Sequence, residues 1–218
     1  CAEEGWQEQV YYNDAGTMMD RNLGATSATP GDVGALGLMY QWGRKDPFMG
    51  SSSISSSVLA VSTGSWNITS GGSVANAETN PMTFYKNMSL PNESWTSLKT
   101  VNDPCPHGWR VPDGGSNGVW AMALGSSSFN NSSLWDSTNK GMNFSGKFGS
   151  DQTIWYPASG YRGSSGDSLD VVGYGGSYWS ASPGDSSAYN LGFNGGGSVK
   201  PSSNSNRACG NSVRCIKE

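Results

Sequence analysis

Residues 178–193 read Tyr178-Trp179-Ser180-Ala181-Ser182-Pro183-Gly184-Asp185-Ser186-Ser187-Ala188-Tyr189-Asn190-Leu191-Gly192-Phe193. Aromatic and aliphatic anchors alternate here with small polar residues, and the same mixture continues from about Gly160 to Glu218. A disordered tail would lack such anchors. Small polar residues and Tyr on a fixed scaffold are typical of a binding surface. The final quarter of the chain therefore favours recognition over chemistry.

The composition predicts a real but unusual core. The chain has 218 residues, of which 35% are hydrophobic and 14% charged, with 31 Gly and nine Trp. Large aromatic side chains can supply the missing apolar area, since each buries roughly 150–250 Å². The net charge of −4 argues against nucleic acid as a partner, because phosphate contacts require Lys and Arg. No apolar run approaches the roughly 20 residues of a membrane helix, and no signal peptide is recognisable, which indicates a mature form or an excised fragment.

The cysteines are Cys1, Cys105, Cys209 and Cys215. Their spacing does not suit a zinc site, which usually has two close pairs. Together with the Ser, Asn and Gly usage, they suggest an exported protein that contains a disulfide. Three pairings are possible, and the spacing alone does not choose among them. Cys1 could carry a lipid anchor or could mark where a fragment begins.

The pattern along the chain predicts an α+β fold with short antiparallel strands, about two short helices and long loops. A hairpin is expected over residues 9–20, with its turn at Asn13-Asp14-Ala15-Gly16. Residues 35–44 could form a buried helical turn or a strand, and residues 113–124 contain the best helix candidate, capped by Ser116 or Asn117. A Ser-rich insertion loop is expected around residues 50–75, anchored by Trp66 and Ile68. Further strands are predicted at 143–148, 154–157, 178–181, 188–193 and 212–216.

Several blocks resemble one known family. The block Asp103-Pro104-Cys105-Pro106-His107-Gly108-Trp109-Arg110-Val111-Pro112 is similar to the "CPxGWRVP" signature of the fibrobacter-type major paralogous domain, a module of secreted and surface proteins. Residues 19–25, which read MDRNLGA, resemble its opening, while residues 178–182 and 212–215 resemble its "YWSAS…SVRC" ending. Residues 40–48, YQWGRKDPF, look like members that end fimbrillin-like proteins. The resemblance spans nearly the whole chain.

The resemblance implies a single C-type-lectin-like domain over residues 1–218, of the branch that contains formylglycine-generating enzymes. That branch also carries the variable proteins of diversity-generating retroelements, in bacteria or phages. In those proteins a C-terminal region like residues 160–218 is rewritten at asparagine codons to change the ligand. A Cys105–Cys215 disulfide is expected on this basis. Cys209 is then either a rewritten position or a partner for Cys1.

The sequence contains few side chains arranged in a way that suits catalysis. His107 is the only histidine and occupies the variable position of its block, so a loop role is expected. Asp20 with Arg21 is expected to be a structural ion pair, and Asp103 and Asp113 are expected to cap turns. Cys209 and Cys215 loosely resemble the redox cysteines of formylglycine-generating enzymes, although Cys215 has a better structural partner. No catalytic residue and no cofactor are predicted.

Classical C-type lectins bind sugar through calcium, and the Asp and Asn oxygens of this chain are hard ligands that suit such an ion. The candidates do not form a regular loop of alternating Asp and Asn, and binding in the related branch is typically independent of metal, so no metal is predicted. These candidates are Asp167, Asp170, Asp185 and Asn194.

The sequence thus predicts a non-enzymatic module at a cell or virion surface that binds a protein or glycan. A structural terminal module of a pilus or surface lipoprotein and a formylglycine-generating-type oxidase are the alternatives. Trp109, Trp120, Trp155 and Trp179 are expected in the core. The predicted ligand-binding residues are Tyr161, Gly163, Ser164, Ser165, Asp167, Asp170, Tyr174, Gly175, Ser177, Tyr178, Gly184, Asp185, Ser186, Ser187, Tyr189, Asn190, Gly192, Asn194, Ser203, Asn204, Ser205, Cys209 and Asn211.

Overall fold

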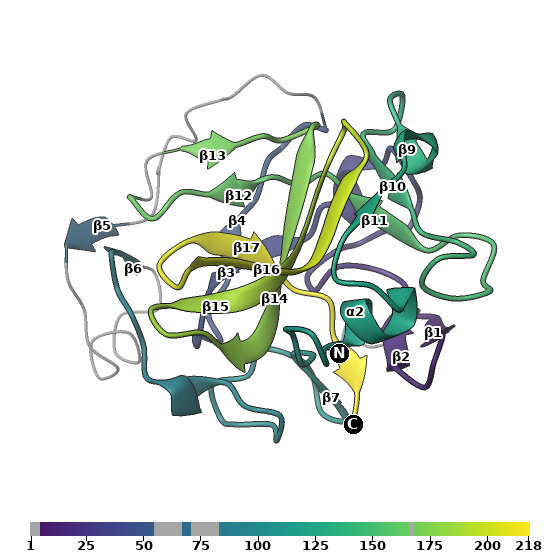
Figure 1. Ribbon diagram of the computed structural model, residues 1–218. Coiled ribbons are helices and arrows are strands. Elements are labelled where there is room, and N and C mark those ends of the chain that lie inside the picture. Colours follow the sequence, from purple (N-terminus) through teal and green to yellow (C-terminus); the bar gives the residue numbers. More distant parts are fainter. Residues whose placement is uncertain (1–4, 55–66, 71–82, 166–167) are drawn as a thin grey trace.

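Three long antiparallel strands cross the middle of the molecule (Figure 1). They are β14 (Gly175–Pro183), β15 (Ser187–Asn194) and β16 (Ser198–Asn206), and β15 lies between the other two. The structure is a computed structural model that describes residues 5–54, 67–70, 83–165 and 168–218.

The three strands belong to the largest sheet, which runs in the order β13-β12-β17-β14-β15-β16-β8. Its other strands are short, and β17 also pairs with β3, which in turn pairs with β4. Within this sheet β14 and β17 run parallel, whereas the neighbouring pairs are antiparallel. The bounds are β3 (Leu38–Gln41), β4 (Phe48–Met49), β8 (Phe129–Asn130), β12 (Tyr161–Arg162), β13 (Leu169–Asp170) and β17 (Gly210–Ser212).

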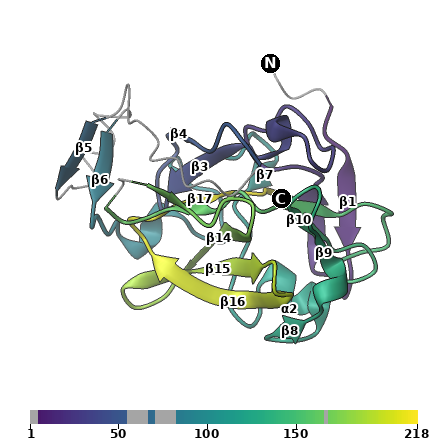
Figure 2. The same cartoon turned by 90° about the horizontal axis from the view of Figure 1, so that it is seen from above.

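Three smaller sheets surround this one. The first runs in the order β1-β2-β18-β7, the second in the order β11-β10-β9, and the third is the parallel pair β5-β6. The pair β5-β6 lies at one side of the molecule, far from β1 and β2, in both views (Figures 1 and 2). The bounds are β1 (Glu8–Tyr11), β2 (Gly16–Met19), β5 (Asn67–Ser70), β6 (Thr83–Lys86), β7 (Trp109–Arg110), β9 (Trp135–Asp136), β10 (Gly141–Asn143), β11 (Trp155–Pro157) and β18 (Ile216–Lys217).

The α+β prediction is wrong, because the chain forms a β-rich fold. Among the described residues one α-helix is present, α2 (Val119–Leu124), together with the short 3-10 turns η1 (Val33–Ala35), η2 (Asn92–Ser94) and η3 (Ser132–Leu134). The predicted C-type-lectin-like architecture, with about two short helices in an α+β fold, is therefore also wrong. Residues 38–41 become β3 because they pair with β17, and Gly37 at φ +70° breaks any helix before them.

Helix α2 is shorter than the sequence pattern predicts. It begins after Gly118, which provides no side-chain cap, so Ser116 and Asn117 do not cap it. It ends at Gly125, whose φ of +69° is the left-handed conformation that commonly closes a helix. Its buried Val119, Trp120 and Ala123 pack into the core, so tertiary contacts rather than capping stabilise it.

The predicted N-terminal hairpin is confirmed. Strands β1 and β2 pair antiparallel, and the Ala15 N–H donates to the Tyr12 carbonyl across the turn at 3.1 Å. Asn13 and Asp14 have φ of +56° and +55°, as both central residues of a type I′ turn must. The strands predicted at 178–181 and 188–193 lie within β14 and β15, and β11 covers residues 155–157 of the strand predicted at 154–157. Most of the predicted insertion loop at 50–75 lies outside the described residues.

One core cluster packs on the inner face of the long strands. Tyr178, Leu191, Phe193 and Val199 alternate along β14, β15 and β16 and are buried on this side. Helix α2 lies against β16 there, beside the aromatic group of Phe144, Phe148 and Tyr156. On the opposite face of these strands Trp179 is also buried, and Ser177 and Asn190 place polar groups beside it.

A second core cluster surrounds the Cys105–Cys215 disulfide, which confirms the pairing expected from the resemblance. Tryptophans make up much of it, and two of the buried indole N–H groups are paired with backbone. Trp179 donates to the Tyr40 carbonyl at 2.7 Å, and Trp42 donates to the Ser180 carbonyl at 2.9 Å. Trp120, Trp155 and Trp179 are buried as predicted, while Trp109 is partly buried against this cluster.

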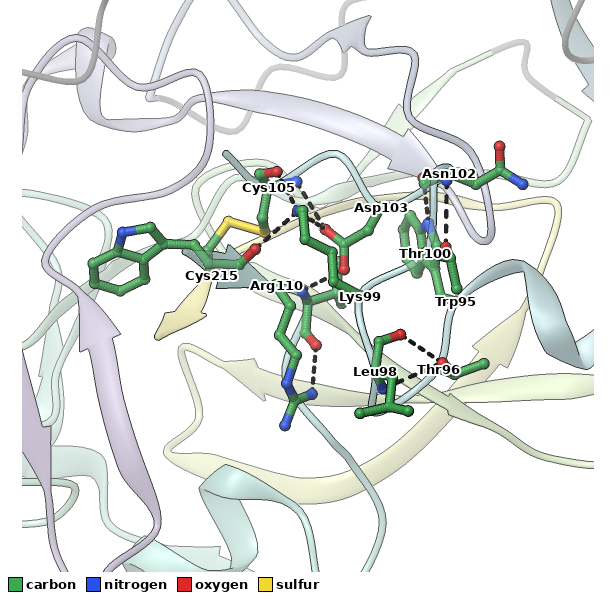
Figure 3. Close-up of polar contacts among 12 residues, drawn as sticks. Trp95, Thr96, Leu98, Lys99, Thr100, Asn102, Asp103, Cys105, Arg110 and Cys215 are labelled. Carbon is green, nitrogen blue, oxygen red and sulfur yellow. Dashed lines mark hydrogen bonds and ion pairs between the residues drawn. A yellow bond between two sulfur atoms is a disulfide. The ribbon is translucent and has the colours of Figure 1, made fainter. Parts of the chain in front are cut away.

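A buried carboxylate organises the loop that carries Cys105 (Figure 3). Asp103 accepts from the N–H of Cys105 and from the N–H of Val111, each at 2.9 Å, so the expected Asx turn is present. Lys99 pairs with this carboxylate at 3.3 Å and also donates to the carbonyls of Cys105 and Trp109. The signature block of residues 103–112 is therefore a folding element around the disulfide.

Removal of the disulfide should destabilise the fold strongly. Cys105 and Cys215 are 110 residues apart in sequence, and a crosslink over such a loop contributes about 3–5 kcal/mol in the chain-entropy account. The double variant Cys105→Ser/Cys215→Ser should lose that much free energy of unfolding, measured by urea titration. Cys209→Ser is the control, with an expected change below about 1 kcal/mol. Equal losses in both variants would contradict this assignment.

Candidate functional site

A hollow of about 360 Å³ opens on the outer face of the long strands. Register explains why it is there. Ser177 on β14, Gly192 on β15 and Lys200 on β16 lie side by side in one row across the sheet. Gly192 contributes no side chain, so a gap remains between its neighbours. We call this feature the central hollow; it is lined by Tyr161, Val171, Tyr174, Gly175, Gly176, Ser177, Asn190, Gly192, Phe193, Asn194, Ser198, Lys200, Ser203 and Ser205.

Asn190 forms the polar centre of the central hollow. Its side-chain N–H₂ donates to Ser177 Oγ at 2.7 Å and to Ser205 Oγ at 2.6 Å, so it links β14, β15 and β16. Its Oδ1 is buried and has no hydrogen-bond partner among the described residues. Buried polar atoms are normally paired, so this oxygen is an exception to be explained.

Tyr174 and Val171 form an apolar rim, and they are 50% and 40% exposed. The Tyr174 ring packs edge-on against Trp135, with ring centroids 6.5 Å apart, and its carbonyl accepts from the Gly195 N–H at 2.7 Å. Its exposed ring is therefore held in place. Val171 has φ of +51°, an outlier for a β-branched residue.

Tyr161 connects the central hollow to a corner at the β12–β13 turn. Asp170 pairs with Tyr161 in the sheet. The pKa of the Tyr161 hydroxyl is raised, mainly because the residue is partly buried and also because the negative charge of Asp170 is near. Cys209 lies at the same corner, where its sulfur contacts the backbone of Ser164, and burial raises the pKa of its thiol to about 11. The thiol is therefore protonated and poorly nucleophilic at neutral pH.

A second hollow, of about 650 Å³, lies at the turn between β14 and β15. We call it the turn hollow; it is lined by Asn92, Pro183, Gly184, Asp185, Ser186, Ser187, Tyr189 and Asn204. Arg207 holds its walls together. The buried guanidinium donates to the carbonyls of Gly184, Ser187 and Leu90 and to Asn92 Oδ1, at 2.6–2.8 Å, and stacks on Trp42.

The structure divides the predicted ligand-binding residues into separate groups. Tyr161, Tyr174, Gly175, Ser177, Asn190, Gly192, Asn194, Ser203 and Ser205 meet in the central hollow. Gly184, Asp185, Ser186, Ser187, Tyr189 and Asn204 meet in the turn hollow. Gly163, Ser164, Ser165, Asp170 and Cys209 belong to the β12–β13 turn and its corner. Asp167 lies outside the described residues.

Two of the predicted residues are core residues instead. Tyr178 is fully buried, and its hydroxyl donates to the Pro157 carbonyl at 2.7 Å, while its ring stacks on Phe193. Asn211 on β17 is also fully buried. Neither side chain can reach a ligand at the surface, so both assignments are corrected.

Sequence reasoning missed several residues of the central hollow. Val171 carries no sequence signal for its position on the rim, because nothing about Val predicts a positive φ. Ser198 and Lys200 were missed because β16 was not recognised as a strand. Strict alternation would put Ser198 and Lys200 on the face opposite Ser203 and Ser205, but the register of β16 against β15 shifts between Asn190 and Gly192, so all four line the same hollow.

The candidate catalytic residues take part in structural contacts or lie on exposed loops. Asp20 pairs with Arg21 at 2.9 Å, as expected, and His107 is exposed on its loop. Cys215 is bonded to Cys105, so Cys209 has no second thiol at hand among the described residues. The described residues also contain no group of three His, Cys, Asp or Glu side chains placed to hold a metal ion.

Comparison with known proteins adds no identity. No family model, no curated protein and no solved structure matches this chain. Within the described residues no helix is long and apolar enough to cross a membrane. The disulfide is consistent with an extracellular protein, because such bonds persist in oxidising compartments.

The strain at Val171 can be tested directly. Replacing it with Asn, which tolerates the left-handed region, should raise the free energy of unfolding by about 1 kcal/mol. Val33→Asn is the control, because Val33 is 47% exposed and is not among the residues with positive φ. Thermal and urea unfolding measure both variants. No gain at position 171, or an equal gain at position 33, would contradict the strain.

The thiol of Cys209 should be unreactive in the folded protein. In a Cys1→Ser background, which removes the N-terminal thiol, alkylation by iodoacetamide at pH 7.5 should be slower than in urea. The folded-state rate should rise about tenfold per pH unit toward a pKa of about 11. A plateau near pH 8 would show an ordinary, accessible thiol.

Proposed function

We propose that this protein is a non-enzymatic binding module whose C-terminal region contacts a protein or glycan ligand at a cell or virion surface. The central hollow carries this proposal. It gathers nine of the predicted ligand-binding residues, from β12 to β16, into one open depression. Its size lies within the usual range of ligand pockets, about 300–1,000 Å³.

A rigid support favours this role. The strands that form the floor are fixed from behind by Tyr178, Leu191 and Phe193, which are buried in the first core cluster. Side chains on the outer face can therefore change without altering the packing on the inner face. Such pre-organisation lowers the cost of ordering a site when a ligand binds.

The resemblance to the fibrobacter-type major paralogous domain supports the same proposal, since that module occurs in secreted and surface proteins. The chemistry of the site agrees with a role in binding. Hydroxyl, amide and phenol groups line the central hollow, and these groups suit recognition through hydrogen bonds and aromatic contact. Rewriting of the C-terminal region remains a further proposal, which a nearby template copy of the 3′ end would support.

Filling the central hollow should abolish binding without unfolding the protein. A Cβ added at Gly192 would meet only Ser203, at an ordinary contact distance of 3.6 Å and beyond. The free energy of unfolding of Gly192→Trp should therefore stay within about 0.5 kcal/mol of the wild-type value. On arrays of purified surface proteins and of glycans, this variant should fail to bind the ligands that the wild-type protein binds.

Val10→Trp is the matched control, because it adds the same side chain to an exposed strand position of a different sheet. It should bind as wild type does. Binding that survives in Gly192→Trp would place the contact surface elsewhere. Absence of any ligand on both arrays would favour a structural module of a surface assembly.

A further inference from the structure

The central hollow offers hydrogen-bond donors that nothing in the described residues uses. Ser177 Oγ and Ser205 Oγ both accept from Asn190, so their own hydroxyl protons are directed elsewhere. Ser203 lies beside them across from Asn190 in the sheet. A ligand rich in hydroxyl and other oxygen acceptors can satisfy such a set.

Asn190 gives an independent sign of a missing partner. The residue lines the hollow and is 2% exposed, and its buried Oδ1 has no hydrogen-bond partner among the described residues. An unpaired buried acceptor is costly, and a hydroxyl donor that enters from the hollow would remove the cost. The floor therefore requires a ligand that both donates and accepts hydrogen bonds over a short distance.

The rim requires an apolar face on the same ligand. Tyr174 presents a half-exposed ring that Trp135 and the Gly195 backbone hold in place, and exposed Val171 lies next to it in the lining. Aromatic rings of this kind provide apolar contact area at low entropic cost. A sugar ring combines one C–H face with a rim of hydroxyls, and so matches the floor and the rim together.

The charge of the residues that line the central hollow indicates which class of sugar fits it. Among the described residues of the lining, Lys200 is the only charged one, and none of them is a carboxylate. Its side chain is exposed, and no ion pair involves it among the described residues. The turn hollow has the opposite character, because Asp185 is the only charged residue in the part of its lining that the structure describes. An anionic ligand is therefore favoured in the central hollow.

We propose that the central hollow binds one sugar ring that carries a carboxylate, as part of an acidic glycan. The ring lies on Tyr174, its hydroxyls exchange hydrogen bonds with Asn190, Ser177 and Ser205, and its carboxylate faces Lys200. A protein epitope fits less well, because protein interfaces bury about 800 Å² on each partner, whereas this hollow accepts a group of single-ring size. This inference rests on the proposed function and specifies its ligand.

The test starts with an array of uronic-acid, sialic-acid and neutral glycans, probed with the full chain. The tightest acidic glycan is then titrated by calorimetry beside its carboxyl methyl ester, which keeps the ring and removes the charge. The acid should bind about two- to fivefold more tightly than the ester at low salt, as an exposed ion pair allows. Lys200→Gln and high salt should each remove that difference.

Two further variants separate the rim from the floor. Tyr174→Ala should weaken acid and ester alike by about tenfold, because the ring contacts either one. Ser205→Ala should weaken both by about fivefold through loss of one hydroxyl. Tyr189→Ala is the matched control, since this tyrosine lies on the same strand as Asn190 but lines the turn hollow. It should bind both ligands as wild type does.

The outcomes distinguish this inference from the proposed function. If no glycan binds but a purified surface protein binds and is lost in Gly192→Trp, the sugar assignment is wrong and the binding module stands. Equal affinity for acid and ester would overturn the role of Lys200. Loss of binding in Tyr189→Ala but not in Tyr174→Ala would move the site to the turn hollow. If neither arrayed class binds, both proposals fall.

Discussion

The last residues of the chain hold the rest of the fold together. Strand β17 pairs with β12, β14 and β3, and β18 pairs with β2 and β7, so residues 210–217 touch strands from both ends and the middle of the sequence. Cys215, which lies between β17 and β18 in the sequence, adds a disulfide to Cys105. Because the contacts are between distant segments, ordering them is entropically expensive, and the disulfide lowers this cost in the unfolded chain.

That closure lets one sheet have two separate tasks. On the inner face, Tyr178 and Phe193 stack in the aromatic core. On the outer face, Ser177 and Gly192 alternate with them and line the central hollow. Since neighbouring residues of a strand point to opposite sides, the same short sequence specifies stability and surface chemistry at once. The composition that looked unusual in the sequence follows from this division.

Physical reasons decide which parts the sequence could predict. Strands β14 and β15 carry aromatic and aliphatic anchors, and both were predicted. Strand β16 reads SVKPSSNSN, with residues of low strand propensity, and exists because it pairs along β15. The sequence leaves residues 35–44 open between a helical turn and a strand, and long-range pairing with β17 makes residues 38–41 a strand. Nine of the residues predicted to bind a ligand, Tyr, Ser and Asn among them, line the central hollow. Lys200 and Val171 depend on register and backbone conformation, which composition does not reveal.

The blocks that resemble a known family belong to the frame and not to the hollows. Arg214, from the C-terminal block, is buried without a carboxylate partner among the described residues. Its guanidinium stacks on Tyr156 at 3.8 Å and donates to Asn22 Oδ1 at 2.8 Å, in the block of residues 19–25. Asp103 plays a comparable part around Cys105. Such buried polar groups fix how distant segments meet. The blocks therefore describe how this surface is supported, whereas Tyr174, Asn190 and Lys200, which line the central hollow, lie outside them.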